Sequence, residues 1–492
     1  MKKYFHNFHC TCVLLSFVIF GASTVFAQNY SWDARRLAMG GMTTTGSGNI
    51  AFEMVPAQYG DLGYSSIVLP FGLIQVLSNL DTFDPDKPDF DLLLVTDYVG
   101  NPFHYTLDRN QREGNVDFVK NIIDSGFSRD LNVYRGFTPP TDLLVEGLLA
   151  PNWGYTFKFR KNQNISYQGI YLGVGPYISL KNDLHFDERL ASILGSENTV
   201  AIPANTTFRI TNTAEQQAAM AITGGYRMKF GISSSSSSDR DGVYAAFNFH
   251  YLRGFRSDVA GLNLRVDTNA AGLVTTPPLP PSQQLPLQDT SILPIFIDHQ
   301  RSSSGNGIAA DLGIGIIKGS WEFGVGVNGI ANRITWDDFR RKQFALTSLF
   351  GGAEFTDCGQ TTIISIPGRA PITGPALFNC LPAPAEIEKE LPVRYSANLA
   401  RHGNNWSSMM DYSYGFQKSS FHTGGEYRFG PLALRAGTRL TRELWHPTGG
   451  IGLNFGGRLG LDVAFFQNSV NLEAQRETSI AFSLRINAKR DQ

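Results

Sequence analysis

The chain has 492 residues, of which 42 are lysine or arginine and 43 are aspartate or glutamate, so its formal net charge at pH 7 is -1. This balance argues against a nucleic-acid partner, which ordinarily requires a basic surface. No stretch reaches the roughly 20 consecutive apolar residues of a membrane helix. The 50 glycines, 35 phenylalanines and 18 tyrosines are typical instead of twisted strands with many aromatic side chains.

The N-terminus has the pattern of a secretory signal. Lys2 and Lys3 precede an apolar run at 13–20, and Val25-Phe26-Ala27 is a small-residue cleavage motif. A membrane anchor is the alternative, but the apolar run is shorter than a span. We therefore expect residues 1–27 to be a cleaved signal peptide.

Residues 28–62 do not alternate and are rich in small side chains. Within them, 34–41 reads Ala-Arg-Arg-Leu-Ala-Met-Gly-Gly, and Pro56-Ala57 follows. These motifs resemble the start of FadL-like outer-membrane transporters for hydrophobic compounds, a family with TraF-like and PorV-like relatives. The alternative is a flexible periplasmic leader.

The resemblance implies that the N-terminal piece folds into the lumen of a barrel of about 14 strands and acts as a hatch. The residues that this implies for gating are Met39, Gly40, Gly41, Asn49, Pro56 and Ala57.

Residues 63–492 show the period of two that is typical of strands. In 406–417, Trp406, Tyr412 and Tyr414 alternate with Ser407 and Asp411, so one face is apolar and the other polar. A soluble sandwich also alternates, with its apolar face on a core. Very short turns and aromatic residues near segment ends favour an all-β transmembrane antiparallel barrel, with lipid outside and water inside.

Counting these segments gives roughly fourteen strands, an even number as bacterial barrels require. The segments are 65–76, 152–160, 166–180, 219–232, 242–255, 307–317, 321–330, 392–401, 406–417, 421–429, 432–441, 449–456, 459–467 and 478–487.

The connections between these strands differ in length on the two sides. Four long ones, 77–151, 181–218, 256–306 and 331–391, fall on one side, and short turns such as Gly430-Pro431 fall on the other. Long extracellular loops and short periplasmic turns are typical of outer-membrane barrels. The pattern predicts a Gram-negative outer-membrane location with both termini in the periplasm.

The long loops contain further patterns. The first holds a carboxylate cluster that is compatible with calcium binding but lacks EF-hand spacing, so an exposed acidic turn is the favoured reading. We expect short helices at 116–127 and 141–149, and an apolar run at 292–297 that folds over the barrel mouth. The carboxylates are Asp81, Asp84, Asp86, Asp89 and Asp91.

Cys358 and Cys380 are the only cysteines after the signal, and both lie in the fourth long loop. In an oxidising compartment such a pair predicts a disulfide, worth about 3 kcal/mol in the chain-entropy model. No second Cys or His pair has ligand spacing, so we expect no metal site.

Motifs for enzymatic chemistry are weak. Gly324-x-Gly326-x-x-Gly329 matches the dinucleotide fingerprint, but it lies within an alternating segment rather than at a strand-to-helix turn. His422 and Asp411 are placed to meet across neighbouring strands, which we interpret as a hydrogen-bonded lumen histidine. We expect neither an enzyme nor a cofactor.

Seven charged residues are predicted to face the lumen. Such charges must pair with one another or meet water. One interpretation is an ion-pair network that stiffens the wall, and the other is that some arginines hold the hatch or attract an anionic head group. The seven are Asp411, Glu426, Arg428, Arg435, Arg439, Asp462 and Arg485.

These observations and the FadL-like resemblance together predict a transporter or channel for hydrophobic small molecules, either fatty-acid-like or hydrocarbon. The resemblance implies passive diffusion through a hatch-gated barrel surrounded by outer-membrane lipid. The alternative is a PorV-like or TraF-like docking protein that serves protein secretion or conjugation and binds a secreted-protein partner. An outer-membrane enzyme is a third possibility.

Overall fold

The structure of the chain is a computed structural model. It describes residues 33–41, 66–70, 105–106, 142–149, 153–158, 167–195, 201–231, 241–275, 295–348, 354–359, 361–364, 372–376, 379–390, 393–415, 418–441, 444–455, 459–468 and 477–487. The predicted signal peptide, residues 42–62, the acidic cluster at 81–91 and the expected helix at 116–127 lie outside the described residues.

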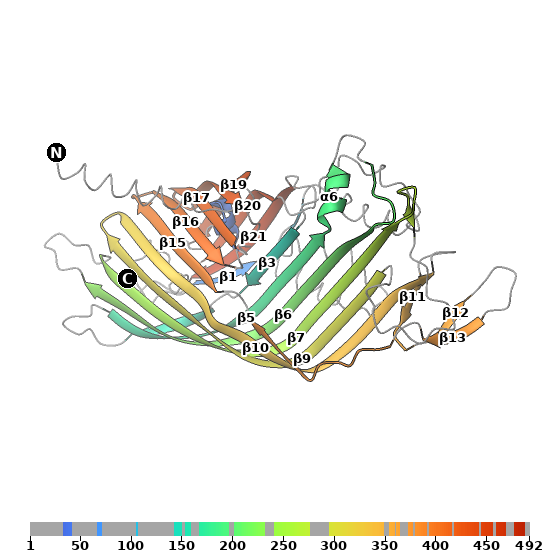
Figure 1. Cartoon of the computed structure of the whole chain (residues 1–492). Helices are drawn as coiled ribbons and strands as arrows, with labels where there is room; N and C mark the ends of the chain where they lie inside the picture. The colour runs from blue at the N-terminus through green and yellow to red at the C-terminus, as the bar shows by residue number, and fades with distance from the viewer. Residues whose placement is uncertain are drawn as a thin grey trace, which may run out of the picture.

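The predicted all-β, antiparallel fold is confirmed, and fourteen strands form one sheet (Figure 1). They are β1 (Ser66–Pro70), β4 (Trp153–Lys158), β5 (Tyr167–Phe186), β6 (Thr207–Gly231), β7 (Gly242–Thr268), β9 (Ile295–Lys318), β10 (Trp321–Ser348), β15 (Arg394–His402), β16 (Trp406–Gly415), β17 (Lys418–Phe429), β18 (Leu432–Thr441), β19 (Leu444–Phe455), β20 (Leu459–Asn468) and β21 (Glu477–Asn487).

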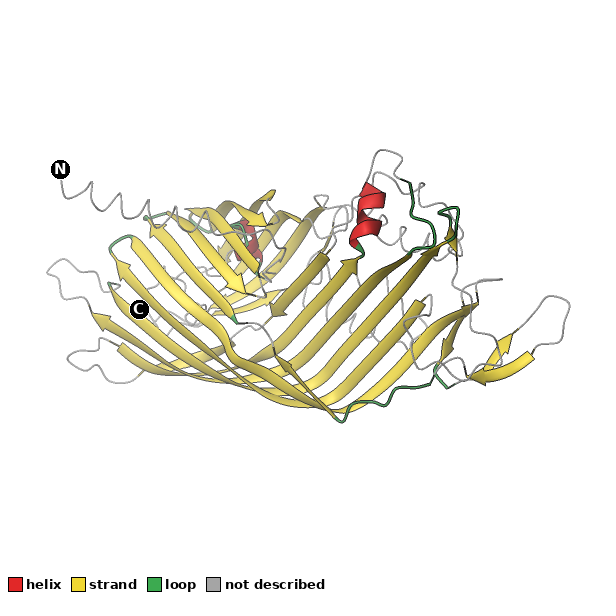
Figure 2. Ribbon diagram, viewed as in Figure 1, coloured by secondary structure: helices red, strands yellow, loops and turns green. Residues whose placement is uncertain are grey.

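The order of the strands in space follows the chain. Each strand from β4 to β21 pairs with the next, and β1 then pairs with β21, so the first and last strands are neighbours. Among the described residues no ladder joins β1 to β4, so the sheet curls toward a barrel without closing (Figure 2).

The two faces of the sheet differ as the period of two predicts. On β7, Phe247, Phe249 and Tyr251 are 42–44% exposed on the outer face, whereas Asn248 and His250 between them are buried on the inner face. The outer face therefore carries a belt of exposed aromatic and aliphatic side chains. None of the helices that the structure describes is long and apolar enough to cross a membrane.

The strands are of unequal length, and this corrects the expected loop limits. β5, β6, β7, β9 and β10 have 20–28 residues, whereas β15–β21 have 9–12. Much of what was predicted as loop therefore continues as ladder, so β5–β10 extend well beyond β15–β21 (Figure 1). We call the parts of these strands at 181–186, 207–218, 256–268, 295–306 and 331–348 the crest.

Short elements border the crest. β3 (Asp142–Leu149) pairs with β5, and β11 (Glu354–Asp357) and β14 (Glu386–Glu390) pair with β10. Helix α6 (Glu188–Gly195) follows β5, β8 (Val274–Thr275) pairs with β7, and β2 (Tyr105–Thr106) pairs with β21. Strands β12 (Thr361–Ile364) and β13 (Ile372–Ala376) form a separate small sheet.

Two local predictions were wrong. The segment 141–149 is not a helix, because eight of its residues form β3 in an antiparallel ladder along β5. The apolar residues Ile295–Ile297 do not fold over the mouth as a loop; they begin β9, with Phe296 and Ile297 buried. In both cases long-range strand pairing prevails over the local pattern.

The predicted disulfide between Cys358 and Cys380 is confirmed. It fixes the end of β11 to the segment before β14, and both sides of it are held to β10. The backbone N–H of Cys358 donates to the carbonyl of Gln343, and the N–H of Leu381 donates to the Gln343 side chain. The crosslink therefore ties this loop to the top of the crest.

Candidate gating site

A short buried helix lies against the inner wall formed by β18–β21. Helix α2 (Ala34–Ala38) begins at Asp33, whose carboxylate accepts a hydrogen bond of 2.8 Å from the N–H of Arg35, as an N-cap residue does. It ends at Gly40 and Gly41, which have positive φ angles of 92° and 74°. All five helical residues are buried, although two of them are arginines.

The end of this helix fits a recess made by glycines. A Cβ at Gly437 of β18 would lie 2.4 Å from the carbonyl carbon of Met39, and one at Gly424 of β17 would lie 2.5 Å from its oxygen. The Thr448 hydroxyl donates to the carbonyl of Ala38 at 3.1 Å, and it accepts from the N–H of Gly40 at 2.9 Å. The wall is therefore shaped for residues 38–40.

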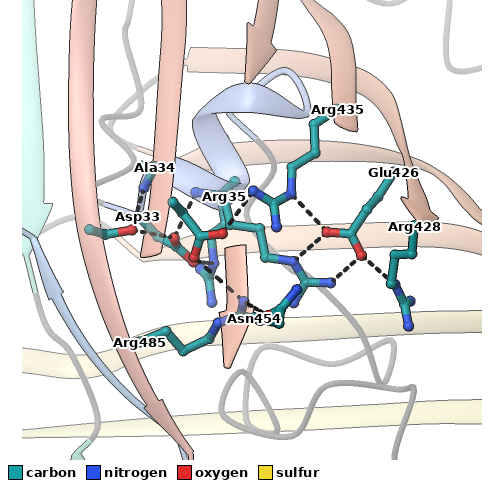
Figure 3. A network of polar contacts seen from close by, with 11 residues as sticks. Asp33, Ala34, Arg35, Glu426, Arg428, Arg435, Asn454 and Arg485 are labelled. Carbon is teal, nitrogen blue, oxygen red and sulfur yellow. Dashed lines mark hydrogen bonds and ion pairs between the residues drawn. The ribbon is translucent and has the colours of Figure 1, made fainter. Parts of the chain in front are cut away.

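Three arginines surround one carboxylate beside the helix (Figure 3). Glu426 of β17 accepts from Arg35 at 3.1 Å, from Arg428 at 2.9 Å and from Arg435 at 2.7 Å. The side chains of Glu426, Arg35 and Arg435 are almost fully buried, and that of Arg428 is 28% exposed. Charge-assisted bonds among groups shielded from water are stronger than surface pairs.

A second carboxylate extends the network across the wall. Asp462 of β20 lies 2.8 Å from Arg435 and 3.6 Å from Arg485. Arg485 also donates to the side chain of Asn454 at 2.7 Å. Because Arg435 contacts both Glu426 and Asp462, the contacts form one continuous chain from β17 to β21.

The other end of the helix is held by the last strand. The Ser483 hydroxyl of β21 accepts from the N–H of Ala34 at 3.3 Å and donates to Asp33 at 3.4 Å. Arg36 lies 3.6 Å from Asp33. Burial by itself lowers the pKa of Arg35, but the nearby carboxylates, Glu426 foremost, raise it above its ordinary value, so this guanidinium stays charged.

The structure brings together five of the seven predicted lumen charges: Glu426, Arg428, Arg435, Asp462 and Arg485. They form an ion-pair network, and that network holds the N-terminal segment, so the two interpretations of these charges are not exclusive.

The other two predicted charges lie outside this ion-pair network, although Arg439 borders the docked segment, since a Cβ at Gly41 would lie 3.9 Å from its Cδ atom. Asp411 is hydrogen-bonded to His422 directly across the ladder at 2.5 Å, in the arrangement expected for a lumen histidine. Arg439 donates to the carbonyl of Gln467 at 3.1 Å and lies over the ring of Phe466.

Of the predicted hatch residues, Met39, Gly40 and Gly41 are in the docked segment, with Met39 fully buried. Asn49, Pro56 and Ala57 lie outside the described residues. The sequence interpretation missed Asp33, Arg35 and Ser483 as contact residues. Aspartate immediately before an Ala-Arg-Arg-Leu-Ala run is a helix-start signal that predicts the cap, but nothing local identifies the partners.

The glycine fingerprint carries no nucleotide site. Gly324 and Gly326 lie inside β10 and pair with both β9 and β15, so no helix follows them. Within the described ranges, no group of three or more His, Cys, Asp or Glu side chains is arranged to hold a metal ion.

Comparison with known proteins gives matches among solved structures only; no family model and no curated protein matched. The CymD monoaromatic hydrocarbon channel is 10% identical over 76% of this chain and 94% of its own, with a TM-score of 0.32. The Pseudomonas putida toluene transporter TodX is 10% identical over 70% and 86%, with a TM-score of 0.26.

A Rhodopseudomonas blastica porin mutant is 9% identical over 64% of this chain and all of its own, with a TM-score of 0.20. The chain is thus similar to hydrocarbon channels and to a porin. At these TM-scores its function has to be inferred from its own residues.

Proposed function

We propose that the protein is a Gram-negative outer-membrane channel that admits hydrophobic small molecules by passive diffusion. The outer face supports a membrane location. Side chains such as Phe247, Ile314 and Phe455 are 42–57% exposed there and belong to a belt that runs over most strands. An apolar surface of this extent is unusual in water but matches the lipid-facing band of a barrel.

The inner face supports an apolar ligand. Trp336 of β10 is fully buried among Tyr177, Leu252, Ile334 and Phe339, which come from β5, β7 and β10. The indole lies close over Gly254 and Gly305, and its N–H donates to Gln217 at 2.9 Å. The members of this cluster are at most 9% exposed, so it is a packed part of the inner wall, and in this proposal a fatty-acid-like or hydrocarbon molecule passes alongside it.

The docked N-terminal segment is proposed to be the gate. The observation that carries this proposal is that residues 33–41 belong to no strand of the sheet and are held on the inner wall by ion pairs and by side-chain packing, with Leu37 in one buried cluster with Phe466 and Met39 in another with Ala400 and Met409. Ion pairs of this kind can be exchanged for water if the lumen hydrates, so the segment can move while the strands stay paired. Displacement of this segment would open the path along β17–β21.

The test is uptake into liposomes that contain the purified protein. We expect faster entry of toluene or of a long-chain fatty acid than into empty liposomes, and faster entry still with Arg35→Ala. Arg333→Ala is the matched control, because the Arg333 side chain is 54% exposed and its ion pair in the described part of the chain is with the exposed Glu388. Uptake no faster than in empty liposomes for both probes contradicts the proposal. A secreted protein that co-purifies stoichiometrically would then favour the docking role.

A further inference from the structure

A polar pocket opens on the crest, on the wall opposite the gating site. Its volume is about 520 Å³. It is formed where β5, β6 and β7 end and α6 begins, above the apolar cluster around Trp336. The lining residues are His185, Asp187, Thr207, Arg209, Thr211 and Arg265.

The pocket belongs to the inner face of the crest. On β6, Thr207, Arg209 and Thr211 are each an even number of residues from Gln217, so their side chains point to the same face as that of Gln217. Gln217 accepts a hydrogen bond from the inner-face residue Trp336. Arg265 of β7 is the direct ladder partner of Arg209, so its side chain is on the same face. Phe208 and Ile210, on the opposite face, are buried. Any molecule that enters the lumen from above passes this pocket.

Two arginines that line this pocket, Arg209 and Arg265, are direct ladder partners, so their side chains start from adjacent positions on the same face. Residues directly opposite on neighbouring antiparallel strands have Cβ atoms about 5 Å apart, and like charges in such pairs are destabilising. His185 adds a third potential cation, opposite Thr211 on the adjacent β5–β6 ladder. Ladder geometry alone therefore disfavours this arrangement.

The nearby carboxylates are engaged in other contacts. Asp267 lies 3.0 Å from Arg265 and also accepts from the hydroxyl of Thr207. Asp187 caps α6, where it accepts from the N–H groups of Arg189 at 2.9 Å and Leu190 at 3.3 Å. Neither carboxylate forms an ion pair with Arg209 among the contacts of the described residues, so Arg209 is the arginine of this pocket whose charge they do not neutralise.

We propose that this pocket binds a tetrahedral oxyanion of the phosphate class between Arg209 and Arg265, with His185 and Thr211 as further donors. Guanidinium groups bind phosphate oxygens through paired N–H donors, and one doubly charged anion offsets the repulsion between two facing arginines. A carboxylate has two acceptor oxygens, fewer than the donors that meet here, whereas a phosphate has at least three. Free phosphate and the phosphate of a lipid or lipopolysaccharide head group share this chemistry.

The experiment is calorimetric titration of the full chain, purified in detergent, with inorganic phosphate. We expect saturable binding that weakens about tenfold in Arg209→Gln, as for the loss of a hydrogen-bonded charge, and less in Arg209→Lys, which keeps the charge. Arg340→Gln is the control, since Arg340 is an exposed arginine of β10 outside the pocket. Heat-dependent gel mobility verifies that each variant is folded.

A second titration distinguishes the sources of the anion. Binding of lipopolysaccharide that inorganic phosphate displaces, and that enzymatic removal of its phosphates abolishes, assigns the site to a head group. Binding of inorganic phosphate that lipopolysaccharide does not compete with assigns it to the free ion. The proposal is overturned if the wild-type chain does not bind phosphate saturably, or if a folded Arg209→Gln variant binds it as tightly as wild type does.

Discussion

The Nε atom of Arg35 lies 3.1 Å from Oε2 of Glu426, although 391 positions separate the two residues in the chain. This contact joins the N-terminal segment to a wall built from the last strands of the sheet. The docking site of the helix is therefore complete only when β17–β21 are paired. The same contact makes Glu426 the centre of both the wall network and the contacts of the docked segment.

Glu426→Gln should destabilise the folded protein. The substitution removes the charge that three arginines share, and two of those arginines are almost fully buried. Breaking a buried pair by removing one partner costs about 3–5 kcal/mol. Urea unfolding in detergent micelles should show this loss, whereas Glu388→Gln, in an exposed pair, should change stability by less than about 1 kcal/mol. Equal stabilities of the two variants would disprove the role of the network.

Gly424→Ala should expel the N-terminal segment while leaving the strands paired. A Cβ there would meet the backbone oxygen of Met39 at 2.5 Å, closer than real contacts allow, and its three nearest neighbours all belong to Met39. We expect a protease to cut within residues 33–41 of the variant and not of wild type. Gly224→Ala is the control, because a Cβ at Gly224 has no neighbour within 4 Å. Resistance of Gly424→Ala to cleavage would show that the recess does not hold the segment.

Trp336→Ala should be among the most destabilising single changes in the long strands β5, β6, β7, β9 and β10. The indole is fully buried and contacts β6, β7 and β9, so its removal leaves a large cavity that costs about 3–5 kcal/mol. Trp321→Ala, which truncates a half-exposed ring of the same strand, should cost much less in detergent. Thermal unfolding of the two variants compares them directly, and a larger loss for Trp321→Ala would argue against the buried cluster.

Removing the disulfide should have a local effect. Cys358→Ser with Cys380→Ser frees a segment that the crosslink closes between residues 22 positions apart. The chain-entropy model assigns such a loop about 3 kcal/mol. We expect proteolysis within 359–379 to accelerate while uptake through the channel is unchanged. Loss of uptake in this variant would instead place the loop on the transport path.

The sequence predicts the limits of the short strands β18, β20 and β21 well. The expected segment 432–441 coincides with β18, and 459–467 and 478–487 fall within one residue of β20 and β21 at each end. These strands have one exposed apolar face and one buried face with many polar side chains, so alternation marks their whole length. The predicted disulfide follows from the number of cysteines alone.

The limits of the strands in the crest could not be predicted from the alternation of apolar and polar residues. At Arg256–Asp258 three consecutive residues are buried, and the ladder between β6 and β7 changes register there, so alternation stops where the ladder continues. The gating contacts are hidden for another reason. Arg35 looks like one of two adjacent surface arginines, and only the position of Glu426 on the folded wall shows that it is buried.

The most direct test of the account is to lock the segment in place. Ala38 and Ala464 belong to one buried cluster, so the variant Ala38→Cys with Ala464→Cys should form a disulfide between α2 and β20. In liposomes we predict little toluene uptake when this crosslink is oxidised and wild-type uptake after reduction. The control is the chain without the new cysteines under the same reductant, because reduction also opens the native disulfide. Equal uptake by the oxidised and reduced variant would contradict gating by residues 33–41.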